Sequence, residues 1–136
     1  PNQNRLIIDA GTCITYDFVN AENQYLGGAI SPGIKIRYKS LNNYTSKLPL
    51  LTLSEDFEII GNSTKSAIHS GVINGVIFEI EGFISQYSLK NQDLTIILTG
   101  GDAEFLAKRL KSTIFANSNF LLESLNLLSL YTQKND

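Results

Sequence analysis

The chain has 136 residues, of which 43% are hydrophobic and 18% charged, so it can bury the core of one ordinary globular domain and is not expected to be disordered, collagen-like or a disulfide scaffold. Eleven Lys and Arg against thirteen Asp and Glu give a net charge of -2 without a basic stripe, which argues against a nucleic-acid partner. The single cysteine, Cys13, closes no internal disulfide, and we read no apolar run of the ~20 residues that a membrane span needs. These features favour a cytoplasmic protein with no membrane partner.

Three strands are predicted at the start of the chain. Residues 6–8 form a short apolar run that ends in the polar turn 9–12, and residues 13–19 alternate large and polar side chains. Residues 25–30 resemble a third strand, which Ser31-Pro32-Gly33 ends. The pattern predicts an antiparallel meander.

A helix and a loop are expected next. Residues 34–43 contain neither Gly nor Pro and end in a polar pair, which favours a helix. Residues 46–61 contain Pro49 among several leucines, and we interpret them as a connecting loop that covers a groove.

The strongest periodic signal spans residues 64–87, where apolar residues recur at three- and four-residue steps. We predict a long, largely buried helix with Asn62 or Ser63 as its N-cap. Gly71 and Gly75 share one face of it, where another backbone can approach closely, either in the core or at a dimer interface.

The last third of the chain predicts a strand at 94–98, a glycine turn at 99–101 and a helix at 103–111 capped by Asp102. We further predict a short edge strand within 114–122 and a final helix at 124–133. This order gives an α/β fold with a mixed sheet, an antiparallel three-strand meander and flanking helices.

The first candidate site is the turn Asp9-Ala10-Gly11-Thr12 at the end of a predicted strand. Gly11 lets backbone N–H groups and the Thr12 hydroxyl approach a phosphate, and the Asp9 carboxylate can hold a cation beside it. An ordinary hairpin turn and the active-site turn of aspartic proteases have the same pattern, so the motif alone leaves the choice open.

Two further glycine turns and one histidine are candidates. The segment 27–33 is either a ligand turn or a bulged strand end, and 99–103 is either a nucleotide turn at a helix start or a plain α/β turn. His69 has no cysteine or second histidine for a metal site, so we expect a satisfied, partly buried residue. A Ser/His/Asp triad lacks nucleophile-elbow spacing and is discounted.

Taken together, the segments IDAGTCITYDF, YLGGAISPGI, STKSAIHSGV and LTGGDAEFL resemble the successive motifs of the type III pantothenate kinases, over residues 6 to about 127. The resemblance implies a ribonuclease H-like domain of the actin-like, hexokinase-like ATPase superfamily. It also implies ATP-dependent phosphorylation of pantothenate, the first committed step of coenzyme A synthesis, by a cytoplasmic homodimer that uses Mg²⁺ and a monovalent cation, K⁺ or NH₄⁺.

The resemblance also implies roles for particular residues. Asp9 falls on the ligand of the monovalent cation, while Gly11 and Thr12 fall on the turn that contacts ATP phosphate. Thr64 falls on a contact to pantothenate, and Gly100-Gly101 fall on the turn near the nucleotide. Each role agrees with the chemistry of the residue type.

The sequence departs from the family pattern in two ways. Cys13 stands where the family more often has Ala, a small-for-small change. The family's earlier Asp-x-Gly-Asn-Thr phosphate loop and the Gly-x-Asp-Arg segment with the general base do not occur in residues 1–136. We therefore interpret 1–136 as a single C-terminal domain of a two-domain kinase, assign it no catalytic residue, and expect it to be inactive without its N-terminal partner domain.

Two alternatives remain. A non-catalytic accessory or dimerisation module would keep the turns as structure and associate through the face of Gly71 and Gly75. A sugar or acetate kinase half of the same superfamily fits less well at Thr64 and at the GGAISPG turn.

Overall fold

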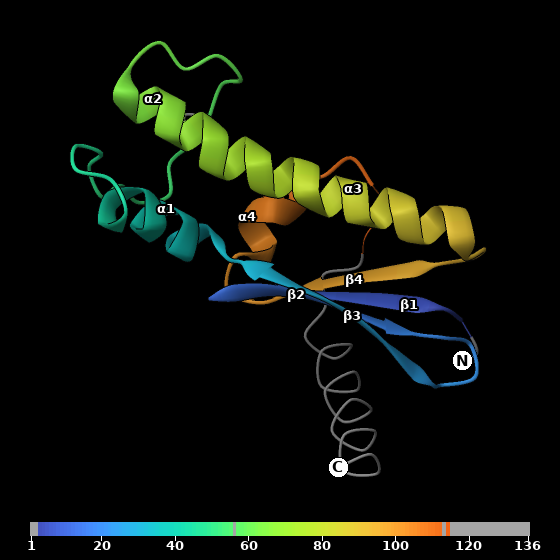
Figure 1. The fold of residues 1–136 in the computed structure, drawn as a ribbon. Helices are drawn as coiled ribbons and strands as arrows, with labels where there is room; N and C mark the ends of the chain where they lie inside the picture. Colours follow the sequence, from blue (N-terminus) through green and yellow to red (C-terminus); the bar gives the residue numbers. More distant parts are fainter. Residues whose placement is uncertain (1–2, 56, 113, 115–136) are drawn as a thin grey trace.

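The computed structural model of the protein describes residues 3–55, 57–112 and 114, and shows a four-stranded mixed sheet with the described helices on one face (Figure 1). The strands are β1 (Arg5–Ala10), β2 (Cys13–Val19), β3 (Tyr25–Pro32) and β4 (Thr95–Thr99). Their order in the sheet is β3-β2-β1-β4. The pairs β1–β2 and β2–β3 are antiparallel, whereas β4 pairs with β1 in parallel. The predicted meander and mixed sheet are confirmed.

The strand pleat divides the buried side chains between the two faces of the sheet. On the helix face, Leu6 and Ile8 of β1 belong to the main core, whereas Ile7 between them belongs to a second, smaller cluster. β3 continues to Pro32, two residues beyond the prediction, opposite Cys13. Pro32 is tolerated there because β3 lies at the edge of the described sheet and the missing N–H breaks no ladder bond.

The first helix, α1 (Ile34–Asn43), has the predicted bounds and buries Ile34 and Tyr38. No helix or strand occurs in the described residues between α1 and Ser63, as expected of the loop. Part of this loop packs against α1, where Asn42 Nδ2 donates to the Leu48 carbonyl at 2.9 Å.

One long helical rod crosses the sheet (Figure 1) and comprises α2 (Thr64–His69), the π-helical segment η1 (Ser70–Asn74) and α3 (Gly75–Lys90). Ser63 is its N-cap: its hydroxyl accepts from Ser66 N–H at 3.1 Å, and the Ser66 hydroxyl accepts from Ser63 N–H at 3.0 Å. The predicted helix is confirmed, and the π-helical segment is new. The expectation that the helix is largely buried is wrong, because most of its residues are half-buried or exposed. Its buried residues are Ile68, Val72, Ile73, Val76, Ile80 and Ile84.

Residues 64–90 form the one helix of the described chain that is long and apolar enough, with a mean hydropathy of 1.3, to meet the criteria of a membrane span. The expectation that no stretch reaches that length is therefore wrong. A core helix meets the same criteria, and here Val76, Ile80 and Ile84 pack into the core that the rod shares with the sheet.

The predicted close approach at Gly71 and Gly75 does not occur within the described chain. A Cβ atom at Gly71 would meet nothing within 4 Å, and at Gly75 only the Arg37 guanidinium at 3.9 Å. A role for this face in contact with a second copy stays a prediction.

The last described helix, α4 (Ala103–Ala107), is shorter than predicted. Lys111 N–H, which would continue it, donates instead to the Glu81 carboxylate of α3 at 2.6 Å. Asp102 occupies the predicted N-cap position, but its side chain makes no capping hydrogen bond. The predicted strand at 114–122, Ile114 apart, and the helix at 124–133 lie outside the described residues.

Candidate functional site

Three turns meet at one edge of the sheet. Because β1, β3 and β4 run in the same direction, their carboxyl ends share that edge. Gly33 N–H, after β3, donates to the Thr12 carbonyl at 3.0 Å, and Asp102 N–H, after β4, donates to the Ala10 carbonyl at 2.9 Å. Ligands of α/β sheets commonly bind at the carboxyl ends of strands.

Two glycines allow this convergence. A Cβ atom at Gly33 would lie 2.2 Å from the Gly11 carbonyl oxygen, closer than any real contact. Gly100 has a φ of +101°, and a Cβ atom there would lie 2.5 Å from Asp9 Oδ1. The backbone turns pack so closely that no other residue type fits at either position.

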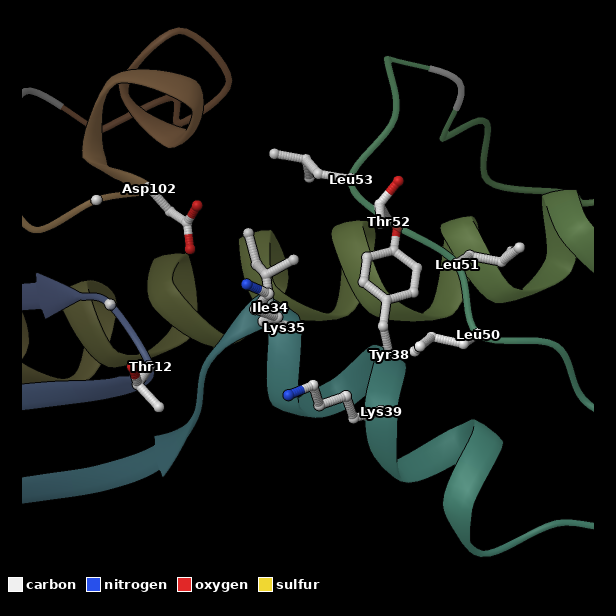
Figure 2. A pocket seen from close by; sticks show the side chains of 12 residues that line it. Thr12, Ile34, Lys35, Tyr38, Lys39, Leu50, Leu51, Thr52, Leu53 and Asp102 are labelled. Carbon is white, nitrogen blue, oxygen red and sulfur yellow. The ribbon is translucent and has the colours of Figure 1, made fainter.

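A cavity of about 540 Å³ opens beside these turns, within the size range of small-molecule sites (Figure 2). Its lining comes from the two sheet-edge turns, from α1 and from the loop that follows α1. The lining residues are Gly11, Thr12, Ile34, Lys35, Tyr38, Lys39, Leu50, Leu51, Thr52, Leu53, Gly101 and Asp102. The expectation that the loop covers a groove is confirmed.

The charges of the cavity come from α1 and from Asp102. Lys35 and Lys39 are one helical turn apart, and Figure 2 shows their ammonium groups directed toward the side where Thr12 and Asp102 lie. Burial raises the pKa of Asp102, and the charge of Lys35 offsets only part of that rise. The lining thus carries two cations and one carboxylate, and Lys35 is the cation that acts on Asp102.

Tyr38 forms a rigid part of the cavity wall. Its hydroxyl lies 2.7 Å from His69 Nδ1, and the two rings pack edge to face. Burial raises the pKa of Tyr38 to about 12, so its phenol stays protonated near neutral pH. His69 is half-buried and hydrogen-bonded, as the sequence indicated.

The structure brings together most of the predicted nucleotide residues. Gly11, Thr12 and Gly101 line the cavity, and Gly100 shapes the turn next to it. The Asp9 carboxylate lies beside Gly100, outside the lining.

The Asp9 carboxylate lies at the Gly100 turn. It is half-buried and receives no hydrogen bond from the described residues, and the Ala10 carbonyl lies beside the same turn. No group of three or more His, Cys, Asp or Glu that could hold a metal occurs in the described part of the chain. One carboxylate completed by carbonyl or phosphate oxygens is a donor set that hard cations accept.

Thr64 lies apart from the cavity. It is exposed at the first position of α2 and does not line the cavity, while Ser63 makes the cap bonds. The N-cap of the rod is therefore Ser63 and not Thr64.

Sequence reasoning missed Lys35, Tyr38 and Lys39, and gave Asp102 only a capping role. The available signal was a pair of lysines at i and i+4 directly after a Pro-Gly turn. Such lysines usually mark a solvated helix face, and only the contact between Gly33 and Thr12 places this one at the site.

Comparison with known proteins agrees with the resemblance of the sequence motifs. The sequence profile described as type III pantothenate kinase matches residues 1–86. Type III pantothenate kinase of Flavobacterium johnsoniae is 64% identical over 136 residues, which are 100% of this chain and 56% of the relative. The enzyme of that name from Flavobacterium psychrophilum is 66% identical over 131 residues, covering 96% and 54%. The chain spans about half the length of the curated relatives it matches.

A solved structure shares the fold. It is described as a Baf family transcriptional activator from Campylobacter jejuni, with a TM-score of 0.62 and 24% identity over 98% of this chain and 59% of that one. At this identity the likeness concerns the fold alone.

Proposed function

The chain belongs to the type III pantothenate kinase family, and from this we propose that it forms the nucleotide-binding part of an enzyme that transfers the γ-phosphoryl group of ATP to pantothenate. The observation that carries the proposal is the meeting of the Gly11–Thr12 and Gly100–Gly101 turns beside a cavity with two lysines. The family membership supports a kinase role in coenzyme A biosynthesis.

The residues of the cavity suit a phosphate chain. Thr12 offers a hydroxyl and the Gly11 turn offers close backbone approach, while Lys35 and Lys39 offer positive charge. Enzymes transfer phosphoryl groups chiefly by positioning them and neutralising their charge. The apolar loop residues Leu50, Leu51 and Leu53 are then available to the uncharged part of the nucleotide.

Two cations belong to the proposal. Asp9 would hold K⁺ or NH₄⁺ beside the phosphate turn, and Mg²⁺ would bind chiefly through phosphate oxygens. Both ions would neutralise phosphate charge. Asp9 would hold the monovalent ion beside the turn, and Thr12 would hold the phosphate.

The finer fold and domain assignment are also part of the proposal. The strand order β3-β2-β1-β4, with an antiparallel meander and a parallel β4, supports a ribonuclease H-like, actin-like ATPase domain. We place residues 1–136 as the C-terminal domain and the general base in an N-terminal domain. The described part of this chain supplies binding groups and no assigned base.

Pantothenate, the homodimer and the cytoplasmic location complete the proposal. Thr64 would contact pantothenate at the exposed start of the rod, where free N–H groups and the helix dipole favour a carboxylate. Because Thr64 does not line the cavity, groups from the N-terminal domain or a second copy would complete that contact.

The test measures ATP-dependent formation of phosphopantothenate by the full-length protein and by its Thr12→Val variant. Loss of one charge-assisted hydrogen bond costs roughly 1.5 to 3 kcal/mol, so the KM for ATP should rise, or kcat/KM fall, about ten- to a hundredfold. Thr15→Val, on β2 and outside the cavity, is the matched control.

The outcomes separate the functions. If the parent protein forms no phosphopantothenate, the proposed kinase activity is refuted. Nucleotide binding or self-association without turnover would favour the accessory module. An ATP titration of Thr12→Val equal to that of Thr15→Val would show that the turn is structural only.

A further inference from the structure

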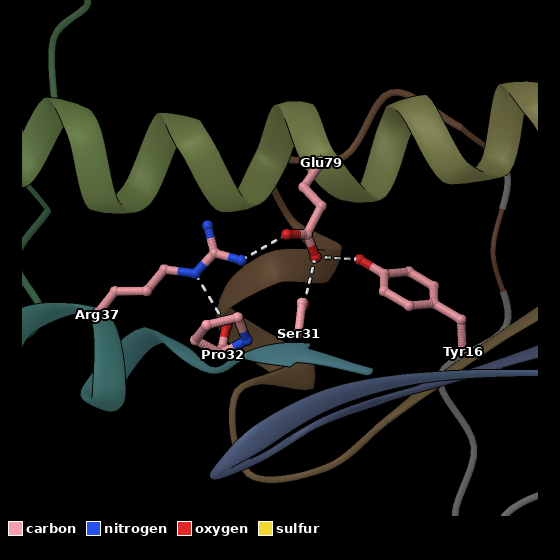
Figure 3. A network of polar contacts seen from close by, with 5 residues as sticks. All are labelled: Tyr16, Ser31, Pro32, Arg37 and Glu79. Carbon is pink, nitrogen blue, oxygen red and sulfur yellow. Dashed lines mark hydrogen bonds and ion pairs between the residues drawn. The ribbon is translucent and has the colours of Figure 1, made fainter. Parts of the chain in front are cut away.

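A polar network lies between α3 and the sheet, beyond the residues that touch the cavity (Figure 3). Its centre is Glu79 of α3. Glu79 Oε2 accepts from the Tyr16 hydroxyl and from Ser31 Oγ, each at 2.6 Å, and Glu79 Oε1 accepts from Arg37 Nη2 at 2.5 Å. One carboxylate thus ties α3 to β2, β3 and α1.

The network holds a nearly buried ion pair. The side chains of Glu79 and Arg37 are each 21% exposed. Burial tends to raise the pKa of Glu79, but the hydrogen bonds from Ser31, Tyr16 and Arg37 and the charge of Arg37 lower it further than burial raises it. Glu79 is therefore ionised near neutral pH. Removing one partner of such a pair leaves the other charge poorly solvated.

Arg37 connects this pair to the backbone that precedes Gly33. Its Nε donates to the Pro32 carbonyl at 2.8 Å, while Nη2 binds Glu79. The rigid guanidinium makes the two bonds from two separate nitrogens, a geometry that the single nitrogen of an ammonium does not reproduce. Arg37 thus fixes the place where β3 ends and α1 begins.

The next contact leads to the phosphate turn. Gly33 N–H donates to the Thr12 carbonyl at 3.0 Å, and the Gly33 α-carbon sits so close that a Cβ atom would lie 2.3 Å from that oxygen. A displacement of the Pro32–Gly33 backbone therefore moves the Gly11–Thr12 turn, because these backbones have no space between them. The same displacement moves the start of α1, which carries Lys35.

We propose that Glu79 and Arg37 are positioning residues for nucleotide phosphate: through the Pro32 carbonyl and Gly33 they hold the Gly11–Thr12 turn and the start of α1 in their binding geometry. The inference rests on the proposed function, and neither residue touches the nucleotide. Small misplacements of binding groups have large kinetic effects.

The experiment uses the full-length protein and the variant Glu79→Gln, which keeps the side-chain shape and removes the charge. We expect the KM for ATP to rise about five- to tenfold, with the KM for pantothenate within about twofold of the parent. Glu81→Gln is the matched control, since Glu81 also lies on α3 and accepts two hydrogen bonds, from Lys111 N–H and Ser112 Oγ, away from the turn. It should lower the melting temperature and leave both KM values unchanged.

A second variant covers the case in which Glu79→Gln does not fold. Arg37→Lys keeps a positive charge near Glu79 but loses the bond to the Pro32 carbonyl, and it should raise the KM for ATP in the same direction. The proposal is overturned if folded Glu79→Gln or Arg37→Lys keeps the parent KM for ATP while its melting temperature falls as in Glu81→Gln. A parent that forms no phosphopantothenate instead refutes the proposed function.

Discussion

Asp102 carries a charge that its surroundings disfavour. Burial raises its pKa above the usual 3.8, and Lys35 restores only part of the difference. The folded protein therefore binds this proton more tightly than the unfolded chain, so the free energy of unfolding falls as pH rises from about 3.8 through the raised value. Binding sites commonly contain groups whose pKa is shifted in this way.

We expect Asp102→Asn to melt at a higher temperature than the parent at pH 7, because the variant has no charge to bury. At pH 3, where the parent carboxyl is protonated, the advantage should vanish. Thermal melts between pH 3 and pH 8 measure both points. Asp93→Asn changes an exposed aspartate before β4 and should show no such pH-dependent gain; equal curves for the two variants would contradict the argument.

Asp9 gives the second prediction for a single residue. Its carboxylate receives no hydrogen bond from the described residues and lies against the Gly100 turn, and we propose it as the ligand of a monovalent cation. In the full-length protein, Asp9→Asn should weaken ATP binding and flatten the dependence of binding on K⁺. Isothermal titration with ATP at a series of K⁺ concentrations tests this, and a K⁺ dependence equal to that of the parent would exclude Asp9 as the ligand.

At the scale of elements, the start of the long rod separates two roles that adjacent residues could share. Ser63 makes the cap bonds, so Ser63→Ala should cost about 1 kcal/mol of stability without changing the KM for pantothenate. Thr64→Ala should raise the KM for pantothenate with little change in melting temperature or in the KM for ATP. The reverse result, with stability lost in Thr64→Ala alone, would show that Thr64 and not Ser63 caps the helix.

The elements also show what the sequence could predict. The strand bounds of β2 and the bounds of α1 follow from local alternation and from the polar residues at their ends. The end of α4 does not, because the Glu81 carboxylate that receives Lys111 N–H comes from another helix. The π-helical segment was also missed, since apolar periodicity over a long window hardly changes when one turn widens.

The residues of the candidate site likewise divide into those that the sequence indicates and those that it does not. Glycine turns at strand ends are local signals: they single out Gly11 and Gly100, and the structure places both turns next to the Asp9 carboxylate. Lys35 and Lys39 look like any solvated helix face until α1 is placed against the Thr12 turn. The network of Glu79 joins residues from four elements, so no sequence spacing indicates it.

At the scale of the whole molecule, we expect the 136-residue chain alone to form no phosphopantothenate. In the proposed division of roles, the general base and the first phosphate loop belong to an N-terminal domain, and general-base catalysis alone contributes typically 10²- to 10⁴-fold. Leu26 and Ile30 of β3 are 61% and 78% exposed, so the isolated chain should also aggregate readily.

The measurement is a coupled assay of the chain alone and with the N-terminal half added in trans. Recovery of ATP-dependent product on mixing is the expected result. Robust turnover by the 136 residues alone would overturn the division of roles and require a base among Asp17, His69 and Asp102.

The parallel pairing of β4 with β1 has a consequence for the order in which the protein folds. Two residues close the hairpin between β1 and β2, whereas Ile8 meets Leu98 only after the long rod has formed and the chain has returned. Closing such a long loop is slow compared with a hairpin. The Gly11–Thr12 turn therefore forms early, and the Gly100 turn reaches it late. During synthesis, a nascent chain that has not yet released β4 from the ribosome holds Thr12 in a hairpin without the cavity, so a ligand of that cavity cannot assist early folding and stabilises only the finished sheet.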